Sequence, residues 1–558
     1  MKIQLIHPPA VVNLYALTAL RPSLPLGLAY IAATLRDAGH GVSVVDALGL
    51  APDQVRPGVR RGLSQIGLTP DEIVARISAD TDAIGITNMW SFCWPVVRDI
   101  VRKLKARFPE KPIIAGGEHF TALPEYSMRQ APLDFIVLGE GEEGAVELLR
   151  ELERGREDWS EVPGIWFRGE NGPTKSSRPR PRRKDLDSIP WPAWDLFDVG
   201  AYNKRRLVTG ICSGMTIPIL ATRGCPYQCA YCSSPNMWTT RWYHRDPVDV
   251  VDEMEHWHTV LGANNFPFHD LTAIIKKNWI LGFCKELARR DMCGRINWQL
   301  PTGTRLEVID DEVACWLARV NGRTLSYAPE SGSTATRQRI KKQMKEESLI
   351  AAVKAATKYR LNLSAFFVAG FPGDTAADLK ATVRLARRLA RRGTRDLAVG
   401  YFFPLPNTQL FSELQQTREI VLNDDFLLTP IYANELRLRD ENNYSHHLSS
   451  RRLTWYRYWI LLNFYAISFS LRPWRFVATL WRALCRRETT KLESYLVDLP
   501  HKLAFVISTQ LAARWFTRTR KAHQPQAAEG AWPVRQAAGR ARGRRASERP
   551  VSPTVLSS

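Results

Sequence analysis

Cysteine is scarce in this chain: there are nine residues in 558, an odd number, and only one place holds several of them together. The opening residues MKIQLIHPPA hold one Lys and then a short strand-like run, which is not the pattern of a secretory signal peptide. We therefore expect a cytoplasmic protein with reduced thiols, and not a fold stapled by disulfides. In a reducing compartment, a tight cysteine cluster indicates metal binding or catalysis.

Long apolar runs are also missing. Residues 458–471 form an uncharged stretch of 14 residues in the aromatic C-terminal region, whereas a membrane-spanning helix needs roughly 20. This basic, aromatic region could lie on a membrane surface, so peripheral membrane contact is an open alternative. The helical pattern continues through residues 502–515, which favours a mainly helical domain over residues 416–522 that covers the mouth of a barrel.

Acidic residues are too few to balance the chain, which has a formal net charge of +21. From residue 451 onward, 20 Lys and Arg face 5 Asp and Glu, so 15 of the 21 excess charges lie in the last fifth of the chain. Residues 523–558 have no apolar period and are rich in Ala, Arg, Pro and Ser. We expect a disordered basic tail there, after a body that is nearly balanced.

Residues 1–154 alternate short apolar runs with amphipathic helical stretches, which predicts a doubly wound parallel sheet. The runs cover residues 3–9, 41–47, 82–88, 112–118 and 134–142. Such a sheet binds ligands beyond the carboxyl ends of its strands. The residues found there are His7, Pro8, Asp46, Asn88, Met89, Trp90, Gly116, Gly117, Glu118, Gly139, Glu140 and Gly141. Paired glycines would admit a large ligand, although plain chain turns explain them equally well. Residues 155–200, rich in Pro, Gly and Arg, are interpreted as a linker.

Three cysteines follow the next apolar run with the spacing C-x3-C-x2-C: Cys225, Cys229 and Cys232. Structural zinc usually takes four ligands in two pairs, and no second C-x2-C pair exists. Three thiolates suit an iron–sulfur cluster, because each can hold one corner of the cube and leave one iron open. The sequence therefore predicts a 4Fe–4S cluster with a position free for a substrate or cofactor.

Residues 201–415 continue with apolar runs and helical stretches that predict a partial (β/α)6 barrel. The candidate strands cover residues 264–270, 296–304, 324–331, 363–373 and 396–406. Functional groups of such barrels gather at the carboxyl ends of the strands. Polar candidates at these ends are Asp270, Gln299, Arg305, Glu330 and Ser331.

The cysteine triplet, with Tyr231 just before its last cysteine, resembles the motif of the radical S-adenosylmethionine (SAM) superfamily. The N-terminal segments HPP, GGEH and GEGE resemble a cobalamin-binding domain. Over residues 1 to about 415, the chain resembles the cobalamin-dependent radical SAM enzymes, which include hopanoid methylases, antibiotic C-methyltransferases and the anaerobic magnesium-protoporphyrin ester cyclase.

This resemblance implies three cofactors: a 4Fe–4S cluster on the triplet, SAM and cobalamin. It assigns SAM to Tyr231, Asp270, Gln299, Arg305, Glu330, Ser331 and Gly370, and cobalamin to the strand-end residues of the first sheet. The sequence departs from one cobalamin motif, D-x-H-x-x-G, because Leu48 stands where histidine would ligate cobalt from below. We therefore expect cobalamin without a lower histidine, and we interpret His7 and His119 as hydrogen-bonding strand-end residues.

By the same resemblance, the chain is a C-methyltransferase that uses a 5'-deoxyadenosyl radical and methylcobalamin. Its substrate would be a bulky, hydrophobic lipid or secondary metabolite, and flavodoxin or ferredoxin would supply electrons to a monomeric enzyme. One alternative is an oxidative cyclase of a tetrapyrrole. Another is a tRNA-modifying enzyme, but those enzymes carry further cluster cysteines in the N-terminal domain, which here holds only Cys93. A nucleic-acid partner is therefore disfavoured.

Overall fold

The computed structural model describes residues 1–13, 16, 21–60, 62–176, 178–322, 324–500 and 502–503. Met1–Val506 form one compact unit. The basic tail predicted over residues 523–558 lies outside the described residues, as does most of the segment after residue 500.

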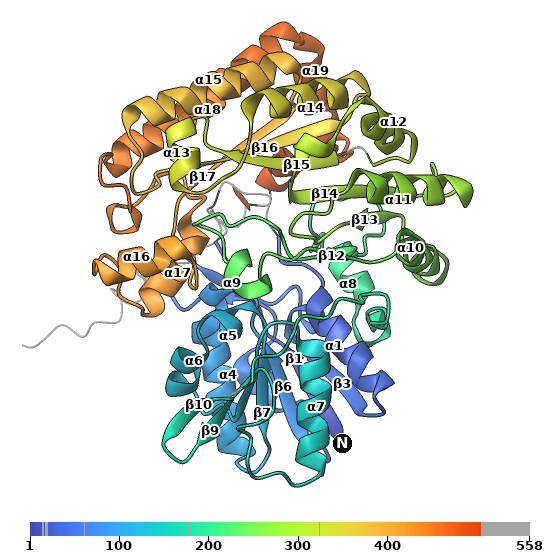
Figure 1. The fold of residues 1–558 in the computed structure, drawn as a ribbon, viewed down its shortest axis with the longest axis vertical. Coiled ribbons are helices and arrows are strands. Elements are labelled where there is room, and N and C mark those ends of the chain that lie inside the picture. Colours follow the sequence, from blue (N-terminus) through green and yellow to red (C-terminus); the bar gives the residue numbers. More distant parts are fainter. Residues whose placement is uncertain are drawn as a thin grey trace, which may run out of the picture. The chain divides into compact units, whose positions relative to one another are not determined.

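The N-terminal region contains a sheet with the strand order β10-β9-β8-β7-β6-β1-β3 (Figure 1). Five of its strands are parallel: β1 (Lys2–His7), β3 (Gly41–Asp46), β6 (Ala83–Thr87), β7 (Ile113–Gly116) and β8 (Phe135–Val137). The order reverses between β1 and β6, which places the ligand-binding switch point at the carboxyl ends of these two strands. The predicted doubly wound sheet is therefore confirmed.

Helices cover both faces of this sheet, as parallel strands with continuous apolar runs require. Figure 1 shows α1 (Leu26–Asp37) and α7 (Gly141–Glu153) on one side, with α4 (Trp94–Arg107), α5 (Glu118–Ala122) and α6 (Pro124–Gln130) on the other. The core on the α1 side is continuous with the barrel core, while the α4 side packs with residues near the ends of the last barrel strands. Shorter elements are β2 (Ala10–Val12), α2 (Ala47–Leu50), β4 (Val55–Pro57), β5 (Ser64–Ile66), α3 (Pro70–Val74) and η1 (Ser91–Cys93).

The segment interpreted as a linker, residues 155–200, contains regular structure, and the interpretation is wrong for its first half. β9 (Ile165–Gly169) and β10 (Gly172–Lys175) form a hairpin, and β9 pairs antiparallel with β8 at the edge of the sheet. The buried side chains of Ile165 and Phe167 hold this hairpin on the sheet, although the Gly-rich turn between its strands suggested a loop. The other domain boundaries stay predictions. Further on lie η2 (Trp194–Leu196) and α8 (Val199–Lys204).

The second sheet is parallel throughout, in the order β13-β14-β15-β16-β17. Its strands are β13 (Asn265–Pro267), β14 (Asn297–Thr304), β15 (Thr324–Glu330), β16 (Asn362–Ala369) and β17 (Asp396–Tyr401). Parallel bridges from Thr216 to Asn265 and from Ile219 to Phe268 add the apolar run before the cysteines as a sixth member. The predicted partial (β/α)6 barrel is confirmed.

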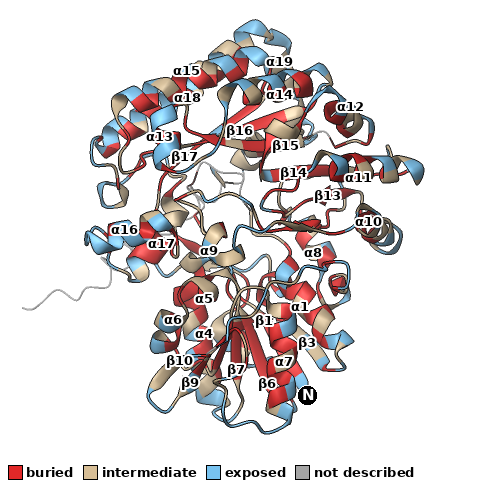
Figure 2. Ribbon diagram, viewed as in Figure 1, coloured by how far each residue is buried: buried red, intermediate tan, exposed pale blue. Residues whose placement is uncertain are grey.

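Helices flank the barrel strands on the outside (Figure 1). They are α10 (Pro247–Leu261), α11 (Lys277–Arg289), α12 (Asp311–Arg319), α13 (Thr334–Arg339), α14 (Glu346–Lys358) and α15 (Ala376–Arg392). Figure 2 shows the strands of both sheets as buried and the outer helix faces as exposed. Short elements near the cysteines are β11 (Thr222–Arg223), α9 (Ser234–Trp238), β12 (Tyr243–His244) and η3 (Leu306–Val308).

The C-terminal region is helical, as predicted, with α16 (Gln409–Gln416), α17 (Asp424–Tyr432), η4 (Asp440–Asn442), α18 (Ser450–Leu471) and α19 (Pro473–Leu484). α18 packs along α15 and against β17, and buries Leu453, Ile460 and Phe464 there. It therefore extends the outer helical layer of the barrel. No helix within the described residues is both long and apolar enough to cross a membrane.

Candidate functional site

The cysteine loop begins at a sharp turn. β11 ends at Arg223, and Gly224 follows with φ +88°, where a side-chain Cβ would lie 2.2 Å from the carbonyl oxygen of Arg241. Only glycine fits this approach. The loop is then fastened on two sides, because the Ala230 amide donates to the Ile340 carbonyl (2.9 Å) and the Ala230 carbonyl accepts from the Leu410 amide (3.0 Å).

The three thiols of this loop, Cys225, Cys229 and Cys232, are free and half-buried. Burial raises the pKa of Cys225, and burial with the neighbouring thiols raises the pKa of Cys232 to about 12. A bound metal cation would reverse this preference for the protonated thiol, because it stabilises the thiolate form. Within the described residues, no three His, Cys, Asp or Glu side chains are grouped as one metal ion requires. A donor set of three thiols that serve separate corners fits a cluster better than a single ion.

Tyr231 and Glu330, both predicted from the sequence, meet beside this loop. The Tyr231 hydroxyl donates to Glu330 Oε1 at 2.7 Å, and Lys342 Nζ donates to the same oxygen at 3.2 Å. Glu330 ends β15 with φ +63°, a backbone conformation uncommon for a residue with a side chain. The Tyr231 ring also contacts Phe371, with ring centroids 5.6 Å apart. Lys342 was missed, because no motif marks it in the sequence.

Arg305 lies over the cysteine loop, with its guanidinium carbon 3.5 Å from the ring centroid of Tyr227. Its Nη1 donates to the carbonyl of Gln343 and to Glu307 Oε1 at 3.2 Å. Its Nη2 is buried and has no hydrogen-bond partner within the described residues. A buried, unpartnered donor of this kind suits a carboxylate, such as that of the amino-acid part of SAM.

Three other predicted residues lie at carboxyl ends of barrel strands. Ser331 Oγ accepts the Ser333 amide at 3.1 Å, and Gly370 adopts φ +92° where a Cβ would lie 2.9 Å from Leu453 of α18. The Asp270 carboxylate accepts from the Ala221 amide (3.2 Å) and the Thr222 hydroxyl (2.5 Å), and burial raises its pKa to about 6. Asp270 therefore fastens the segment that leads into the cysteine loop.

The structure does not bring Gln299 to this group. It is the third residue of β14, five residues before the strand ends. Its Oε1 accepts the Ile211 amide at 2.8 Å, and its Nε2 donates to the Ile211 carbonyl at 2.9 Å and to Asn265 Oδ1 at 3.1 Å. These bonds occupy the Gln299 side chain in holding neighbouring segments together.

At the carboxyl edge of the first sheet, the polar residues that end β1 and β3 contact each other. His7 Nδ1 lies 2.7 Å from Asp46 Oδ1, and the Tyr202 hydroxyl donates to the same oxygen at 3.0 Å. His119 is buried between Ser91 (3.0 Å) and Ser127 (3.2 Å), and burial lowers its pKa to about 3. Both histidines thus make the hydrogen bonds expected of strand-end residues. Leu48 is buried in α2.

The other predicted cobalamin residues form a more open edge. Met89 and Trp90 are 47% and 64% exposed after β6, and Gly139, with φ +67°, has no atom within 4 Å of its missing Cβ. Gly117 has φ +109°, and a Cβ there would lie 2.8 Å from the Asn88 carbonyl oxygen. The buried side-chain amide group of Asn88 has no hydrogen-bond partner within the described residues. This edge fits a broad ligand with polar groups. Pro8 is buried, and Gly116 and Gly141 continue the edge.

A buried ion-pair network joins this edge to the cysteine loop. Arg223 Nη2 donates to Glu142 Oε1 at 2.6 Å, Arg223 Nη1 lies 3.4 Å from Glu140, and Arg182 Nε donates to Glu140 at 3.2 Å. Burial opposes ionisation of Glu142, but Arg223 lowers its pKa below the usual range. Arg223 stands two residues before Cys225, so the acidic residues at the edge of the first sheet hold the start of the cysteine loop. Sequence reasoning missed both arginines.

A second contact joins the same parts: Trp238 Nε1 of α9 donates to Glu118 Oε1 at 3.1 Å, and burial raises the pKa of Glu118. Glu118 and Glu140 were predicted as cobalamin contacts. The structure instead engages their carboxylates with side chains from the cysteine-loop region and from the segment that leads to it.

Two family models match this chain: the B12 binding domain over residues 13–149 and the radical SAM superfamily over residues 219–386. An uncharacterized methyltransferase of Pyrococcus horikoshii is 29% identical over 482 residues, which cover 85% of this chain and 93% of that protein. Cytidylyl-2-hydroxyethylphosphonate methyltransferase of Streptomyces wedmorensis is 27% identical (68% and 76% covered). The anaerobic magnesium-protoporphyrin IX monomethyl ester cyclase of Rubrivivax gelatinosus is 28% identical (75% and 71% covered).

Solved structures share the fold. TsrM of Kitasatospora setae, a radical SAM methyltransferase with cobalamin and a [4Fe-4S] cluster bound, superposes with a TM-score of 0.57 at 19% identity, covering 76% of this chain and 79% of that one. The cobalamin-dependent radical enzyme OxsB superposes with a TM-score of 0.58 at 16% identity, covering 79% and 60%. The chain thus joins a B12-binding domain to a radical SAM domain that carries the cysteine triplet, which is the domain architecture of a cobalamin-dependent radical SAM enzyme.

Proposed function

We propose that this enzyme transfers a methyl group to an unactivated carbon of a bulky, hydrophobic lipid or secondary metabolite. Relatives named as methyltransferases cover most of the chain, and the match to the Pyrococcus horikoshii protein covers 93% of that protein. When bound, the cluster and SAM supply a carbon-based radical, and cobalamin carries the methyl group.

One observation supports this proposal more than the others: the ion-pair network of Arg223 with Glu140 and Glu142. Methyl transfer requires that a cobalamin site and a cluster site open onto one reaction space. Arg223, directly before the turn at Gly224, ties the strand ends of the first sheet to the start of the cysteine loop. The network is buried, so it fixes the spacing between the two sites.

The residues of the chain then have separate tasks. We assign the cluster to Cys225, Cys229 and Cys232, and the polar part of SAM to Arg305 and to the group formed by Tyr231, Glu330, Ser331 and Gly370. Asp270 acts as a positioning residue, since its carboxylate holds the segment before the cysteine loop. The open edge at Met89, Trp90 and the strand-end glycines is assigned to cobalamin, and its apolar exposed side chains favour a hydrophobic neighbour.

The experiment is anaerobic reconstitution with iron, sulfide and cobalamin, followed by reaction with SAM that carries a deuterated methyl group. We expect 5'-deoxyadenosine and a product that contains the deuterated methyl in extracts of candidate lipids and metabolites. A product that is oxidised or ring-closed without deuterium would refute methyl transfer and favour the cyclase alternative.

The triplet provides a matched pair of variants. Cys229→Ala should lose iron, and its yield of 5'-deoxyadenosine should fall at least about a thousandfold, because the cluster cannot form without its thiolate ligands. Cys315→Ala, on the exposed face of α12, should behave like the parent enzyme. Equal activity of Cys229→Ala and the parent would contradict the cluster assignment.

A further inference from the structure

Helix α19 differs from an ordinary surface helix in which side chains it exposes. Its large apolar side chains face solvent: Trp474 is 65% exposed, Val477 66%, Trp481 66% and Leu484 81%, with Phe476 and Leu480 also exposed. No residue of this helix is buried. Figure 2 shows α19 as exposed and intermediate, in contrast to the buried strands of the barrel. A surface helix normally places its apolar stripe on the core, so this arrangement leaves an apolar surface without a partner in the described structure.

The arginines of α19 occupy the side where apolar residues would be expected. Arg475 donates to the carbonyl of Gly393 at 3.2 Å and lies 3.4 Å from the hydroxyl of Ser468. Arg482 lies 3.3 Å from Thr489 Oγ1 and 3.4 Å from Glu493 Oε1. These contacts attach the polar side of the helix to the end of α15 and to the segment after α19. They therefore fix the apolar side outward.

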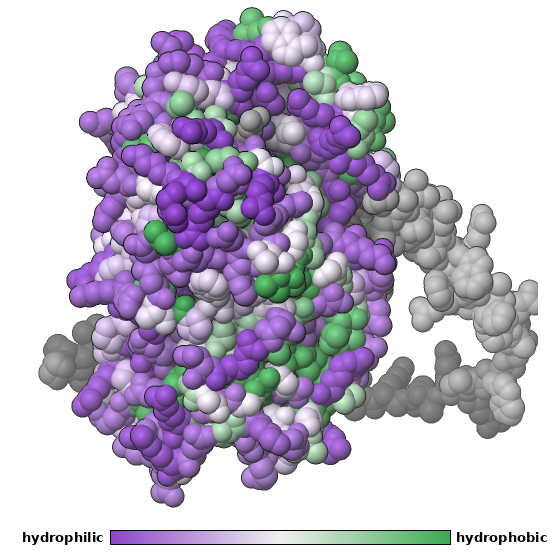
Figure 3. Space-filling model, turned by 90° about the vertical axis from the view of Figure 1, so that its right-hand side faces the viewer, coloured by the Kyte–Doolittle hydropathy of each residue, from purple (hydrophilic) through white to green (hydrophobic). Residues whose placement is uncertain are grey.

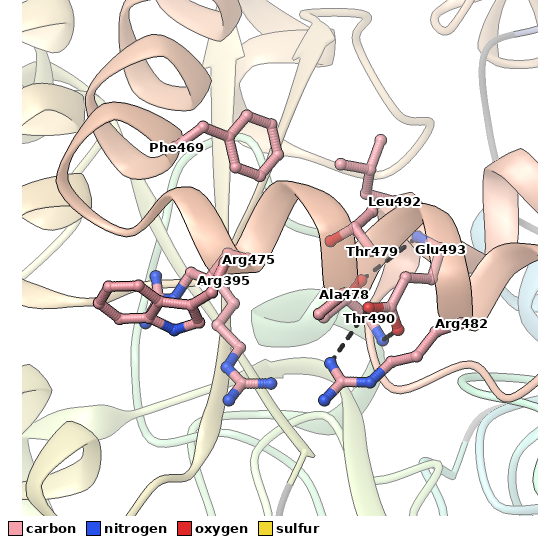
Figure 4. Close-up of a pocket in the computed structure, with 10 residues that line it drawn as sticks. Arg395, Phe469, Arg475, Ala478, Thr479, Arg482, Thr490, Leu492 and Glu493 are labelled. Atoms are coloured by element: carbon pink, nitrogen blue, oxygen red, sulfur yellow. Dashed lines mark hydrogen bonds and ion pairs between the residues drawn. The ribbon is translucent and has the colours of Figure 1, made fainter.

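A small cavity of about 70 Å³ lies beside the helix, which supplies part of its lining, and this is several times the space that one water needs. Figure 4 shows Arg395, Arg475 and Arg482 among the residues that line it, with the ring of Phe469 close by. The only acidic lining residue is Glu493, whose carboxylate already accepts from Arg482 and from the Thr489 and Thr490 amides. The cavity thus contains excess positive charge.

Arg395 differs from the other two arginines of the cavity in its bonding. Within the described residues, its guanidinium makes no ion pair or hydrogen bond, and the residue is half-buried. Burial and the neighbouring cations Arg472 and Arg395 lower the pKa of Arg475 to about 10, and burial with Arg482 nearby lowers that of Arg395. An anion in the cavity would relieve this crowding of cations.

Charge around the helix identifies the kind of surface that it would meet. From Ser450 to Arg487 the chain has eight arginines and no aspartate, glutamate or lysine. Figure 3 shows a face on which hydrophilic side chains dominate and apolar side chains gather in a few patches. An apolar stripe with tryptophans, on a helix whose two charged side chains are both arginines, complements the headgroup layer of an anionic bilayer. An acidic protein partner would offer charge but no hydrocarbon layer for six exposed apolar side chains.

We propose that α19 docks this enzyme on an anionic phospholipid bilayer. The helix lies parallel to the membrane plane, and its apolar side chains enter the boundary between headgroups and acyl chains. A lipid phosphate occupies the arginine cavity. The enzyme therefore works at a membrane surface, where a hydrophobic substrate would be concentrated. This inference concerns binding alone and does not depend on the proposed methyl transfer.

The test is flotation of the full-length protein with two kinds of vesicle: phosphatidylcholine alone, and phosphatidylcholine with phosphatidylglycerol. We expect the parent protein to bind the anionic vesicles more tightly. The triple variant Trp474→Ser/Trp481→Ser/Leu484→Ser should bind them at least about tenfold more weakly. Arg395→Gln should lower the anionic-vesicle affinity about fivefold, the usual effect of one cation near such a surface.

Matched controls come from other surfaces of the same chain. Val260→Ser/Val421→Ser removes two exposed apolar side chains elsewhere (59% and 69% exposed), and Lys285→Gln removes an exposed cation on α11. Both should bind like the parent, and circular dichroism should show all variants folded. If the triple variant still binds, another basic segment is responsible and the proposal fails. It also fails if the parent binds neither vesicle, or if the triple variant only converts a dimer to a monomer, which would identify a second copy as the partner.

Discussion

At the strand ends of the N-terminal sheet, both histidines bond to neighbouring side chains: His7 lies against Asp46, and His119 lies between two serines. At the strand ends of the barrel, charged and polar groups instead converge on the cysteine loop, and Arg305 keeps one buried donor without a partner among the described residues. The first surface is suited to a ligand chosen by shape. The second is suited to one chosen by charge.

This difference follows from what each site must hold. Glycines and the exposed Met89 and Trp90 leave a flat, open edge, which suits a broad macrocycle. Fixed cations beside three thiols suit small anionic groups, because charge-assisted hydrogen bonds give orientation as well as affinity. Arg223 is one of the residues that join the two surfaces, since it stands at the start of the cysteine loop and pairs with acidic residues of the first sheet's edge.

Replacing Arg223, which links the two surfaces, should have the largest effect on the free energy of unfolding. Arg223→Met leaves Glu142 as an unpaired buried carboxylate, which costs about 3–5 kcal/mol of the free energy of unfolding. The double variant Arg223→Met/Glu142→Leu should recover more than half of that loss, because an apolar pair removes both buried charges. Urea denaturation monitored by circular dichroism measures both.

The control for this experiment is an exposed ion pair. Arg205 pairs with Asp53 where both side chains are about half exposed, so Arg205→Met should change the free energy of unfolding very little. Parent-like stability of Arg223→Met, or a double variant less stable than the single one, would show that the network does not hold the two parts together.

Tyr231→Phe tests the surface at the strand ends of the barrel. We expect it to have a smaller effect than the replacement of Arg223. The change removes the 2.7 Å hydrogen bond to Glu330 but keeps the ring against Phe371. A hydrogen bond to a charged group contributes about 1.5–3 kcal/mol, so SAM affinity should fall at least about tenfold. Iron content should stay at the parent level, because the three thiols are untouched. A loss of iron with unchanged SAM affinity would instead make Tyr231 a structural support of the loop.

Sequence patterns predicted those parts of this protein that depend on local order. The apolar runs locate the strands of both sheets, and the spacing of the cysteines locates the loop. Gln299 was misplaced because its position along β14 depends on strand register, which shifts between Leu300 and Gly303. The partners of Arg223 lie 81 and 83 residues away, and no local pattern encodes such a contact. The orientation of α19 was equally hidden, since periodicity gives a stripe but not the side it faces.

The pH dependence of stability tests the surface at the strand ends of the N-terminal sheet, through His119. Its imidazole is buried and its pKa is lowered to about 3, whereas the pKa of an unfolded histidine is about 6.5. The unfolded state therefore binds the proton first, and stability is lost as the pH falls from 6.5 towards 3. At pH 5.5 this linkage amounts to about 1.4 kcal/mol. His119→Gln should flatten the dependence of unfolding free energy on pH in this window, while His256→Gln, at an exposed position on α10, should follow the parent curve. Parallel curves for the parent and His119→Gln would mean that a proton reaches the imidazole in the folded protein, and that this edge is more open than its serine contacts indicate.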